Sequence, residues 1–558
     1  MTTTAAHSQG WHPLAKDAVL AAWLVVAGNL PLWLTVSRLP EAAASPLMLP
    51  ALALFLLCAL LASFGLLMWR PWRRVLGAAL IALAGMGSYF MWTYGIVIDP
   101  GMVANVFHTD AVEAAGLFTL PLVLAVVLGV ALPVIWWWRA PVRTVRWTRQ
   151  LWQRGLVVLL ALLVAAGLLF ATFQDLASLM RNNKSLRYMV NPYNSVYALV
   201  RQGVSESAHA AQPLQAIGLD ARAAGTAMAA DAAPVIVLVV GETARADNFG
   251  VGGYARDTTP RLSALSASGD ITYFSQVHSC GTSTQVSVPC MFSRLGRAGL
   301  DGPREENVLD LLQRAGLAVA WIDNQSGCKG VCDRVPNERA MDAVGQGVCQ
   351  GEACPDAVLP ELALKRLATL DAQRRTLGSV IVLHQMGNHG PAYFERSQKS
   401  HKVFLPECET NTLSSCDEQR IVNAYDNGIR ETDAMLGELI DRLAALQRPA
   451  AVLYVSDHGE SLGENGLFLH GMPWSVAPEV QKHVPMVMWL SPAMQARLQV
   501  HNDCLRGLAA KPWSHDNLFH TLAGLAQVEG KDVNPAQDIL AACASADSVA
   551  RVGVRSPQ

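Results

Sequence analysis

Residues 235–243 read Val-Ile-Val-Leu-Val-Val-Gly-Glu-Thr, an apolar run that ends in a polar turn. Similar short runs follow at Val319–Ile322, Val380–Leu383, Ala451–Val455 and Val484–Leu490. Helical stretches separate them, such as Asn307–Ala315, Glu361–Leu377 and Gln419–Leu446. Continuous apolar runs are typical of buried parallel strands, and their alternation with helices favours a mostly parallel sheet with helices on both faces. We therefore expect an α/β domain over residues 234–558.

Polar side chains follow three of these runs, at the point where each predicted strand ends. Glu242 follows the first run, His389 the third, and Asp457, His458 and Glu460 the fourth. Ligands of open α/β sheets bind beyond the carboxyl ends of the strands, so these side chains are expected at one rim. One such residue alone usually caps a turn or helix, but carboxylates and imidazoles gathered together suit zinc.

A loop rich in hydroxyl groups lies between the first two runs. Residues 280–290 read Cys-Gly-Thr-Ser-Thr-Gln-Val-Ser-Val-Pro-Cys, and a disulfide across it would hold it in a defined shape. A helix that begins within it would favour an anion such as phosphate, and a metal could activate a hydroxyl as a nucleophile. A simple capping loop is the alternative. Residue types alone do not choose among Thr282, Ser283, Thr284 and Ser287.

The first third of the chain contains long apolar runs. Hydrophobic residues make up 51% of the chain and charged residues 16%, against the usual charged share of about 25%. Each run approaches or exceeds the roughly 20 residues that a helix needs to cross a bilayer. We therefore expect a transmembrane domain of five helices within residues 1–174, at about 18–36, 47–69, 75–98, 117–138 and 156–173.

The connectors predict the orientation of these spans. Arg70, Arg73 and Arg74 lie in the second connector, and the fourth carries five arginines, of which Arg139 is the first and Arg154 the last. The first connector has one arginine, and the third has no Lys or Arg. By the positive-inside rule the N-terminus is inside and everything after the fifth span is outside. A cleaved signal peptide is disfavoured, because the first run exceeds the usual apolar region of about 7–15 residues.

Residues 175–233 are expected to bridge the two domains. Gln174–Gly203 mixes basic and tyrosine residues with apolar ones, which fits an amphipathic segment on the membrane surface and equally a solvated connector. Ser205–Ala233 is rich in alanine and is expected to be a linker. The formal net charge of -2 argues against a nucleic-acid partner.

The cysteines also indicate an oxidising compartment. Ten of the eleven lie beyond residue 279. An even, clustered set outside the membrane predicts disulfides, and a zinc ribbon is disfavoured because no Cys-x-x-Cys repeat occurs. The simplest connectivity joins neighbours: Cys280–Cys290, Cys328–Cys332, Cys349–Cys354, Cys408–Cys416 and Cys504–Cys543.

Several long segments closely resemble one family, the lipid A phosphoethanolamine transferases, which include the transferable colistin-resistance enzymes. The segments are Gly241–Arg245, Ser279–Phe292, His384–Tyr393, Asn423–Asn427 and Ser456–Gly471, with Asn105–Asp110 and Asn182–Asn194 in the membrane part. The resemblance covers nearly the whole chain. It implies an alkaline-phosphatase-like, or sulfatase-like, fold for the outer domain, located in the periplasm and anchored in the bacterial inner membrane.

The resemblance also implies roles for individual residues. Thr284 is similar to the family nucleophile, which becomes phosphorylated, and Glu242, Thr284, Asp457 and His458 are similar to its zinc site. At least one zinc is expected, and a second remains open. Catalytic roles are implied for Lys329, His389 and His470. Substrate contacts are implied for Lys329, His389, Glu460 and His470 and, on the outer loop after the third span, for Thr109 and Glu113. The pair Cys328 and Cys332 departs from some family members and is expected to stiffen the loop of Lys329.

The reaction implied is transfer of phosphoethanolamine from phosphatidylethanolamine to a phosphate of lipid A through a phosphothreonine-type intermediate, giving resistance to polymyxin. A monomer is expected. Sulfatases are disfavoured because the stretch after Thr284 lacks their Cys/Ser-x-Pro-x-Arg pattern, and the cysteine-rich matches disfavour a lipoteichoic-acid-type polymerase. A related transferase acting on another envelope glycan remains an alternative, as does a non-enzymatic membrane module stabilised by zinc. Structural zinc sites, however, are normally closed by four Cys or His ligands.

Overall fold

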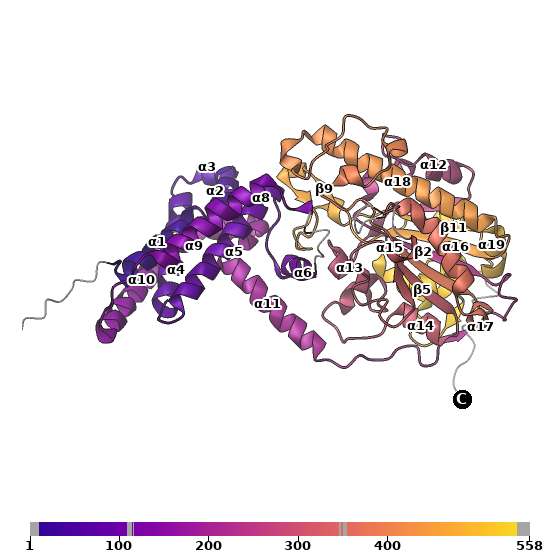
Figure 1. Cartoon of the computed structure of the whole chain (residues 1–558), viewed down its shortest axis with the longest axis horizontal. Helices are drawn as coiled ribbons and strands as arrows, with labels where there is room; N and C mark the ends of the chain where they lie inside the picture. Colours follow the sequence, from indigo (N-terminus) through magenta and orange to yellow (C-terminus); the bar gives the residue numbers. More distant parts are fainter. Residues whose placement is uncertain (1–9, 109–113, 115, 345–347, 350–353, 544–558) are drawn as a thin grey trace, which may run out of the picture. The chain divides into compact units, whose positions relative to one another are not determined.

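The structure is a computed structural model that describes residues 10–108, 114, 116–344, 348–349 and 354–543. The chain forms two compact units. The helical unit comprises Met1–Val103 and Phe118–Val204, and the α/β unit comprises Ala104–Leu117 and Ser205–Gln558. Figure 1 shows the helices of the first unit and the mixed helices and strands of the second.

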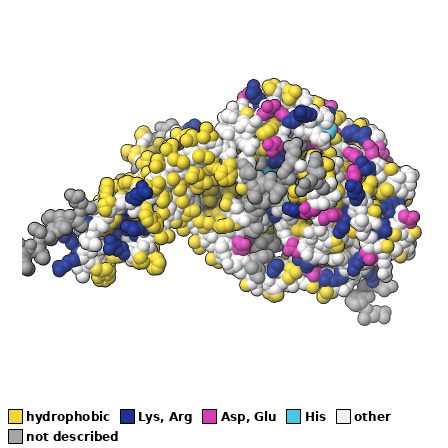
Figure 2. All heavy atoms as spheres, viewed as in Figure 1, with side chains coloured by type: hydrophobic (Ala, Val, Ile, Leu, Met, Phe, Trp, Pro, Cys, Tyr) yellow, Lys and Arg dark blue, Asp and Glu magenta, His cyan; other side chains and the backbone are white. Residues whose placement is uncertain are grey.

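The helical unit contains the expected membrane spans. Four helices are long and apolar enough to cross a bilayer: α4 (Met48–Leu67), α5 (Arg73–Tyr94), the run from α8 to α9 (Leu120–Arg139) and α10 (Trp147–Asn182). The pair α1 (Pro13–Val26) and α2 (Leu30–Ser37), bent by 46° at a short break, makes a fifth if the two helices are counted as one broken span. Hydrophobic side chains dominate the face of this unit in Figure 2, as expected of a surface that meets lipid.

Two spans differ from the sequence prediction in their limits. The first is broken, because the ring of Pro31 clashes with the carbonyl four residues earlier in a continuous helix. The fifth lies in α10, which begins at Trp147 and so starts before the apolar run at 156–173. α10 continues to Asn182 beyond a kink at Thr172, next to the predicted end of the span. The added turns are polar, and hydropathy therefore did not include them.

The α/β unit is built on a seven-stranded sheet. Its strands are β2 (Val235–Gly241), β3 (Ile271–Phe274), β5 (Ala318–Asp323), β6 (Asn337–Arg339), β7 (Ser379–His384), β8 (Ala450–Ser456) and β11 (Met486–Leu490), in the order β3-β11-β8-β2-β7-β5-β6. β11 pairs antiparallel with both neighbours, and the other pairs are parallel. The predicted, mostly parallel sheet is confirmed. β3 and β6 were not predicted, because both are short edge strands and β6 is polar.

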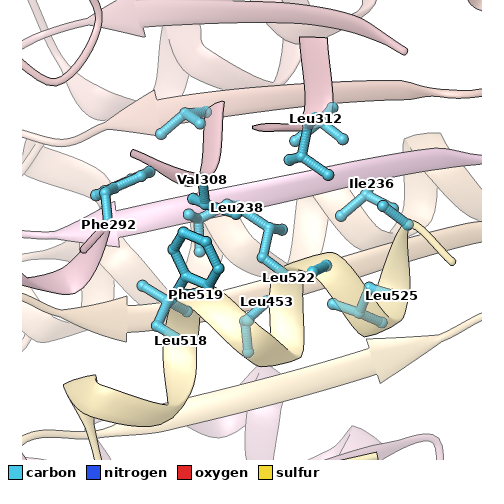
Figure 3. Packing of buried hydrophobic residues seen from close by; sticks show 14 of the residues in the cluster. Ile236, Leu238, Phe292, Val308, Leu312, Leu453, Leu518, Phe519, Leu522 and Leu525 are labelled. Carbon is cyan, nitrogen blue, oxygen red and sulfur yellow. The ribbon is translucent and has the colours of Figure 1, made fainter. Parts of the chain in front are cut away.

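Helices cover both faces of the sheet. One face packs against α14 (Val308–Arg314) and α21 (Leu518–Leu525), and the other against α16 (Leu359–Thr369) and α18 (Glu418–Ala444). Figure 3 shows the first of these layers, with side chains of α21 beside those of β2 and β8. The helix predicted over 361–377 is interrupted, because Leu370 is extended and Asp371 caps a new short helix, α17 (Ala372–Arg375).

Disulfides and the bridging segment complete the α/β unit. All five predicted cysteine pairs are disulfides, and Cys58 is free.

The prediction of a linker over Ser205–Ala233 is partly wrong. Helix α11 (Tyr193–Ala210) enters it, Ile217 is buried in the core, and strand β1 (Arg222–Ala223) pairs with β13 (Val528–Glu529). This part of the chain is therefore packed against the domain that follows it.

Candidate active site

Three buried ligand-type side chains meet beyond the carboxyl ends of two neighbouring strands. Glu242 follows β2, and Asp457 and His458 follow β8, which pairs directly with β2. All three side chains are fully buried. His458 Nε2 lies 3.5 Å from Glu242 Oε1 and 3.4 Å from Asp457 Oδ2. The topology of the sheet thus produces the rim cluster that the strand ends predicted.

Thr284 is the loop hydroxyl that reaches this cluster. Helix α13 (Thr284–Met291) begins at this residue, and its Oγ1 lies 3.1 and 3.2 Å from the two carboxylate oxygens of Glu242. It also lies 3.3 Å from His458 Nε2. Two of the alternatives are engaged elsewhere: Thr282 Oγ1 donates to the Met472 carbonyl, and Ser287 Oγ accepts the Gly281 amide.

The cluster fits a metal ion. Asp457 Oδ1 accepts the amides of Thr243 and His458, whereas its buried Oδ2 has no hydrogen-bond partner within the described part of the chain. Burial and repulsion from Glu242 raise the pKa of Asp457 well above its usual range. Such a pair of carboxylates is stabilised by a divalent cation between them. The three ligand atoms lie within 4.8 Å of one another, which is compact enough for one ion.

The imidazole of His458 is in the state that a metal requires. Burial, followed by repulsion from His470, lowers the pKa of His458 to about 3, so its ring is neutral at physiological pH. Its Nδ1 lies 2.9 Å from the carbonyl of Gly459. A hydrogen bond donated there leaves the lone pair of Nε2 directed at the carboxylates.

Two further histidines lie beside the cluster. The rings of His458 and His470 are 4.3 Å apart between centroids, and those of His470 and His389 are 5.6 Å apart. His470 Nδ1 lies 3.0 Å from Glu460 Oε2, and Glu460 Oε1 accepts a hydrogen bond of 2.8 Å from Tyr393. Glu460 therefore orients His470 and leaves its Nε2 available for proton transfer.

Not every expected residue joins this group. The ammonium of Lys329 donates to the carbonyl and hydroxyl of Ser326, at 3.1 and 2.8 Å, so both of these hydrogen bonds stay within its own loop. The Cys328–Cys332 disulfide encloses Lys329, as expected. Thr109 and Glu113 lie outside the described residues.

One residue that the sequence did not single out holds Glu242 in place. Thr243 adopts a φ of 57°, a left-handed conformation that is strained for a β-branched residue. Its hydroxyl donates to Glu242 Oε1 at 2.6 Å, and its carbonyl accepts the Tyr425 hydroxyl at 2.7 Å. Its position directly after Glu242 was the only signal in the sequence.

A second such residue joins two parts of the site. His515 is fully buried, and burial lowers its pKa to about 4. Its Nδ1 accepts the amide of Cys280 at 3.0 Å, and its Nε2 donates to the carbonyl of Ser456 at 2.9 Å. The neutral ring therefore ties the loop that carries Thr284 to the end of β8. No strand end or motif in the sequence pointed to it.

Comparisons with known proteins agree with this arrangement. The Sulfatase family model matches residues 234–528, and the model for phosphoethanolamine transferase EptA/EptB matches residues 54–206. Phosphoethanolamine transferase EptA of Salmonella typhimurium is 40% identical over 481 residues, covering 84% of this chain and 85% of the relative. Phosphatidylethanolamine transferase Mcr-1 of Escherichia coli is 38% identical over 510 residues, covering 87% and 91%.

A solved structure matches both units. The integral membrane protein lipooligosaccharide phosphoethanolamine transferase A (EptA) from Neisseria meningitidis is 33% identical, with a TM-score of 0.90 over 95% of this chain and 98% of that one. The helical unit is accordingly the inner-membrane anchor, and the sulfatase-like unit is the periplasmic domain. The chain belongs to the family of membrane-anchored phosphoethanolamine transferases that includes EptA and Mcr-1.

Proposed function

We propose that this enzyme transfers phosphoethanolamine from phosphatidylethanolamine to a phosphate group of lipid A, with Thr284 as the covalent nucleophile. Relatives support both substrates: one is named phosphatidylethanolamine transferase Mcr-1, and another, 28% identical, is named Kdo(2)-lipid A phosphoethanolamine 7''-transferase. Adding an amine to lipid A lowers its negative charge and weakens its attraction for cationic peptides such as polymyxin.

The observation that carries this proposal is the position of Thr284. Its hydroxyl lies at the start of α13 and within 3.3 Å of both Glu242 and His458. The free amides of a helix N-terminus favour an anion, so a phosphoryl group bound there would meet the hydroxyl. A buried hydroxyl placed between an anion site and a metal site is suited to phosphoryl transfer.

A zinc ion fits the donor set of this site. Glu242, Asp457 and His458, together with the Thr284 hydroxyl, would hold it, and His389 with His470 remain candidates for a second ion. Zinc, when bound, supplies a Lewis acid that lowers the pKa of a hydroxyl and offsets charge on phosphoryl oxygens.

In the first half-reaction, Thr284 Oγ1 releases its proton to solvent and attacks the phosphorus of phosphatidylethanolamine. The new Oγ1–P bond forms as the bond from phosphorus to the diacylglycerol oxygen breaks. His470, oriented by Glu460, or His389 beside it gives that oxygen a proton. Lys329 would contact the phosphate by exchanging its hydrogen bonds to Ser326 for bonds to the substrate.

In the second half-reaction, a phosphate oxygen of lipid A attacks the phosphorus on Thr284, and Oγ1 leaves and takes up a proton from solvent.

Thr109 and Glu113 are proposed to bind the donor lipid, from family resemblance alone. We also propose that residues 1–174 form the membrane domain, 175–233 the bridging segment and 234–558 the catalytic domain, and that the enzyme works as a monomer.

The experiment that tests this function compares lipid A from cells that express the intact chain with lipid A from cells that express Thr284→Ala. We expect a phosphoethanolamine-sized mass addition with the intact chain and none with the variant. Thr284→Ser, which keeps a hydroxyl, should retain part of the activity and shows that the site folds. If the intact chain adds nothing to lipid A but releases diacylglycerol from phosphatidylethanolamine, the acceptor is wrong and the donor is right. If it does neither, the proposal fails.

A further inference from the structure

A group of two cations and one indole lies next to the nucleophile loop, and we call it the basic patch: Arg297, Trp474 and Lys482. The guanidinium carbon of Arg297 lies 3.8 Å from the centroid of the Trp474 ring, and Lys482 Nζ lies 5.4 Å from it. All three side chains are partly exposed. The indole thus holds two positive charges at a surface that solvent and ligands can reach.

Arg297 has no carboxylate partner within the described part of the chain, although its backbone amide donates to Asp516. Its side chain instead donates to the carbonyl of Cys280, and burial, opposed by Asp516, lowers its pKa. Its neighbour Arg294, with similar access, forms a two-point ion pair with Glu305. A half-buried guanidinium that forms no ion pair with the carboxylate beside it is well suited to bind a further anion.

Other arginines without an ion pair lie elsewhere in the fold. Arg448 is one example, but it precedes β8 and therefore lies at the opposite edge of the sheet from the cluster at Asp457. The position of Arg297 beside the nucleophile loop is what distinguishes it.

Hydrogen bonds join the patch to the site from two directions. The amide of Gly471 donates to the Thr282 carbonyl at 2.7 Å, and the Thr282 hydroxyl donates to the Met472 carbonyl at 2.6 Å. The segment that continues from His470 into Trp474 is thereby fastened to the loop that leads into Thr284. Arg297 holds the same loop at Cys280. The patch is therefore continuous with the site.

We propose that the basic patch binds the phosphorylated sugar of the acceptor and presents its phosphate to the phosphoryl group on Thr284. This inference rests on the proposed function. The planar fork of Arg297 matches a phosphate, and Lys482 adds a second charge. The indole Nε1 of Trp474, which has no partner within the described residues, is a further donor. Glu479 pairs with Lys482 at 3.3 Å, but this acid is largely exposed and its contact is readily exchanged.

Measuring the two half-reactions separately distinguishes acceptor binding from a general effect on catalysis. Diacylglycerol release in the absence of lipid A reports the donor step alone, and transfer to lipid A reports both steps. An acceptor site influences the second measurement and leaves the first unchanged. A residue that merely supports the nucleophile loop influences both.

The test uses the purified full chain in detergent, with phosphatidylethanolamine as donor and lipid A as acceptor. For Arg297→Gln and, separately, Trp474→Leu, we expect the KM for lipid A to rise about tenfold, because a charge-assisted contact to phosphate is lost. Diacylglycerol release without acceptor should stay within about twofold of wild type for Trp474→Leu. For Arg297→Gln, which also loses the hydrogen bond to Cys280, it should fall by a smaller factor than transfer does. Arg304→Gln removes the same charge from an exposed residue later in the same segment of the chain and should leave both measurements unchanged.

Arg297→Lys keeps the charge but loses the fork, and its KM should lie between those of wild type and Arg297→Gln. The inference is overturned if both patch variants transfer phosphoethanolamine at the wild-type rate with an unchanged KM for lipid A. A parallel fall in diacylglycerol release by variants that melt at the wild-type temperature also overturns it. A wild-type chain that transfers nothing to lipid A ends the proposed function and this inference together.

Discussion

The two units treat buried charge in opposite ways. In the helical unit, Asp17 is buried between Arg73 and Arg154, and each guanidinium donates to one of its carboxylate oxygens at 2.9 Å. Arg154 also donates to the carbonyls of Phe64 and Met68 at the end of α4, both at 2.7 Å. These contacts join the ends of several helices. Both oxygens of the Asp17 carboxylate are therefore paired within the protein itself.

In the α/β unit, the buried carboxylates of Glu242 and Asp457 both lie beside the neutral ring of His458, with no cation near either of them among the described side chains. Asp457 Oδ2 has no hydrogen-bond partner among the described residues. The contrast is informative because burial alone does not distinguish a structural ion pair from a functional site. A carboxylate with a cation on each oxygen is complete as it stands, whereas two buried carboxylates without a cation call for one.

Metal removal should have the largest effect of the changes considered, and it should act on the α/β unit and not on the helical unit. After treatment with a chelator, we expect transfer activity to fall by about a thousandfold or more, because the nucleophile and the phosphoryl charge both lose their main stabilisation. The α/β unit should also melt at a lower temperature, since an ion that binds only the folded state stabilises it. Added zinc should restore both. Full activity in a sample shown by metal analysis to be free of metal would contradict this.

Asp17→Asn should have the opposite pattern. It leaves two buried guanidinium groups without their anion, and we expect a loss of roughly 3–5 kcal/mol in the stability of the helical unit. Zinc affinity should not change, because the cluster at Glu242 and Asp457 is intact. Unfolding in detergent and zinc titration measure the two quantities, with the exposed Asp175→Asn as control. Weakened zinc binding at unchanged stability would remove the distinction between the two clusters.

His515→Phe should show how far the metal cluster depends on its surroundings. The variant loses the hydrogen bonds to Cys280 and Ser456, so the loop of Thr284 is no longer fixed to the end of β8. A small displacement of a nucleophile costs about a hundredfold in rate, so we expect the turnover number to fall about 10- to 100-fold, with less change in the KM for the donor. His515→Asn, which keeps an acceptor for Cys280, should recover part of the rate. Equal rates in both variants would indicate that the Cys280 bond is unimportant.

The smallest effect is expected for an ion pair near the surface. His483 Nδ1 lies 3.2 Å from Asp247, and this hydrogen bond raises the pKa of His483. A raised pKa in the folded state means that the stabilisation is fully present below about pH 6.5 and is lost as the pH rises through the folded value. Because Asp247 is exposed, the contribution should be less than about 1 kcal/mol. Asp247→Asn should remove this pH dependence from thermal unfolding, and an unchanged profile would argue against it.

The sequence alone was sufficient where the signal is local. Apolar runs predicted the five spans and the five longer strands, because burial of a whole segment requires a continuous composition. Neighbouring cysteines paired as expected, and four of the five pairs close short loops. The prediction failed where composition is mixed: β6 is polar, the start of α10 is polar, and the alanine-rich linker is partly packed.

The residues of the site also fall into those that the sequence predicts and those that only the structure shows. The sequence by itself placed Glu242, Asp457 and His458 at strand ends, because a strand that stops at a polar turn is visible in the chain order. It did not choose Thr284 among the loop hydroxyls without family resemblance. The tertiary structure brings the Thr284 hydroxyl within hydrogen-bond distance of Glu242 and His458. It alone revealed His515, which is 235 residues from Cys280 along the chain. Hydrogen bonds act over about 3 Å, so partners distant in sequence are known only once the chain has folded.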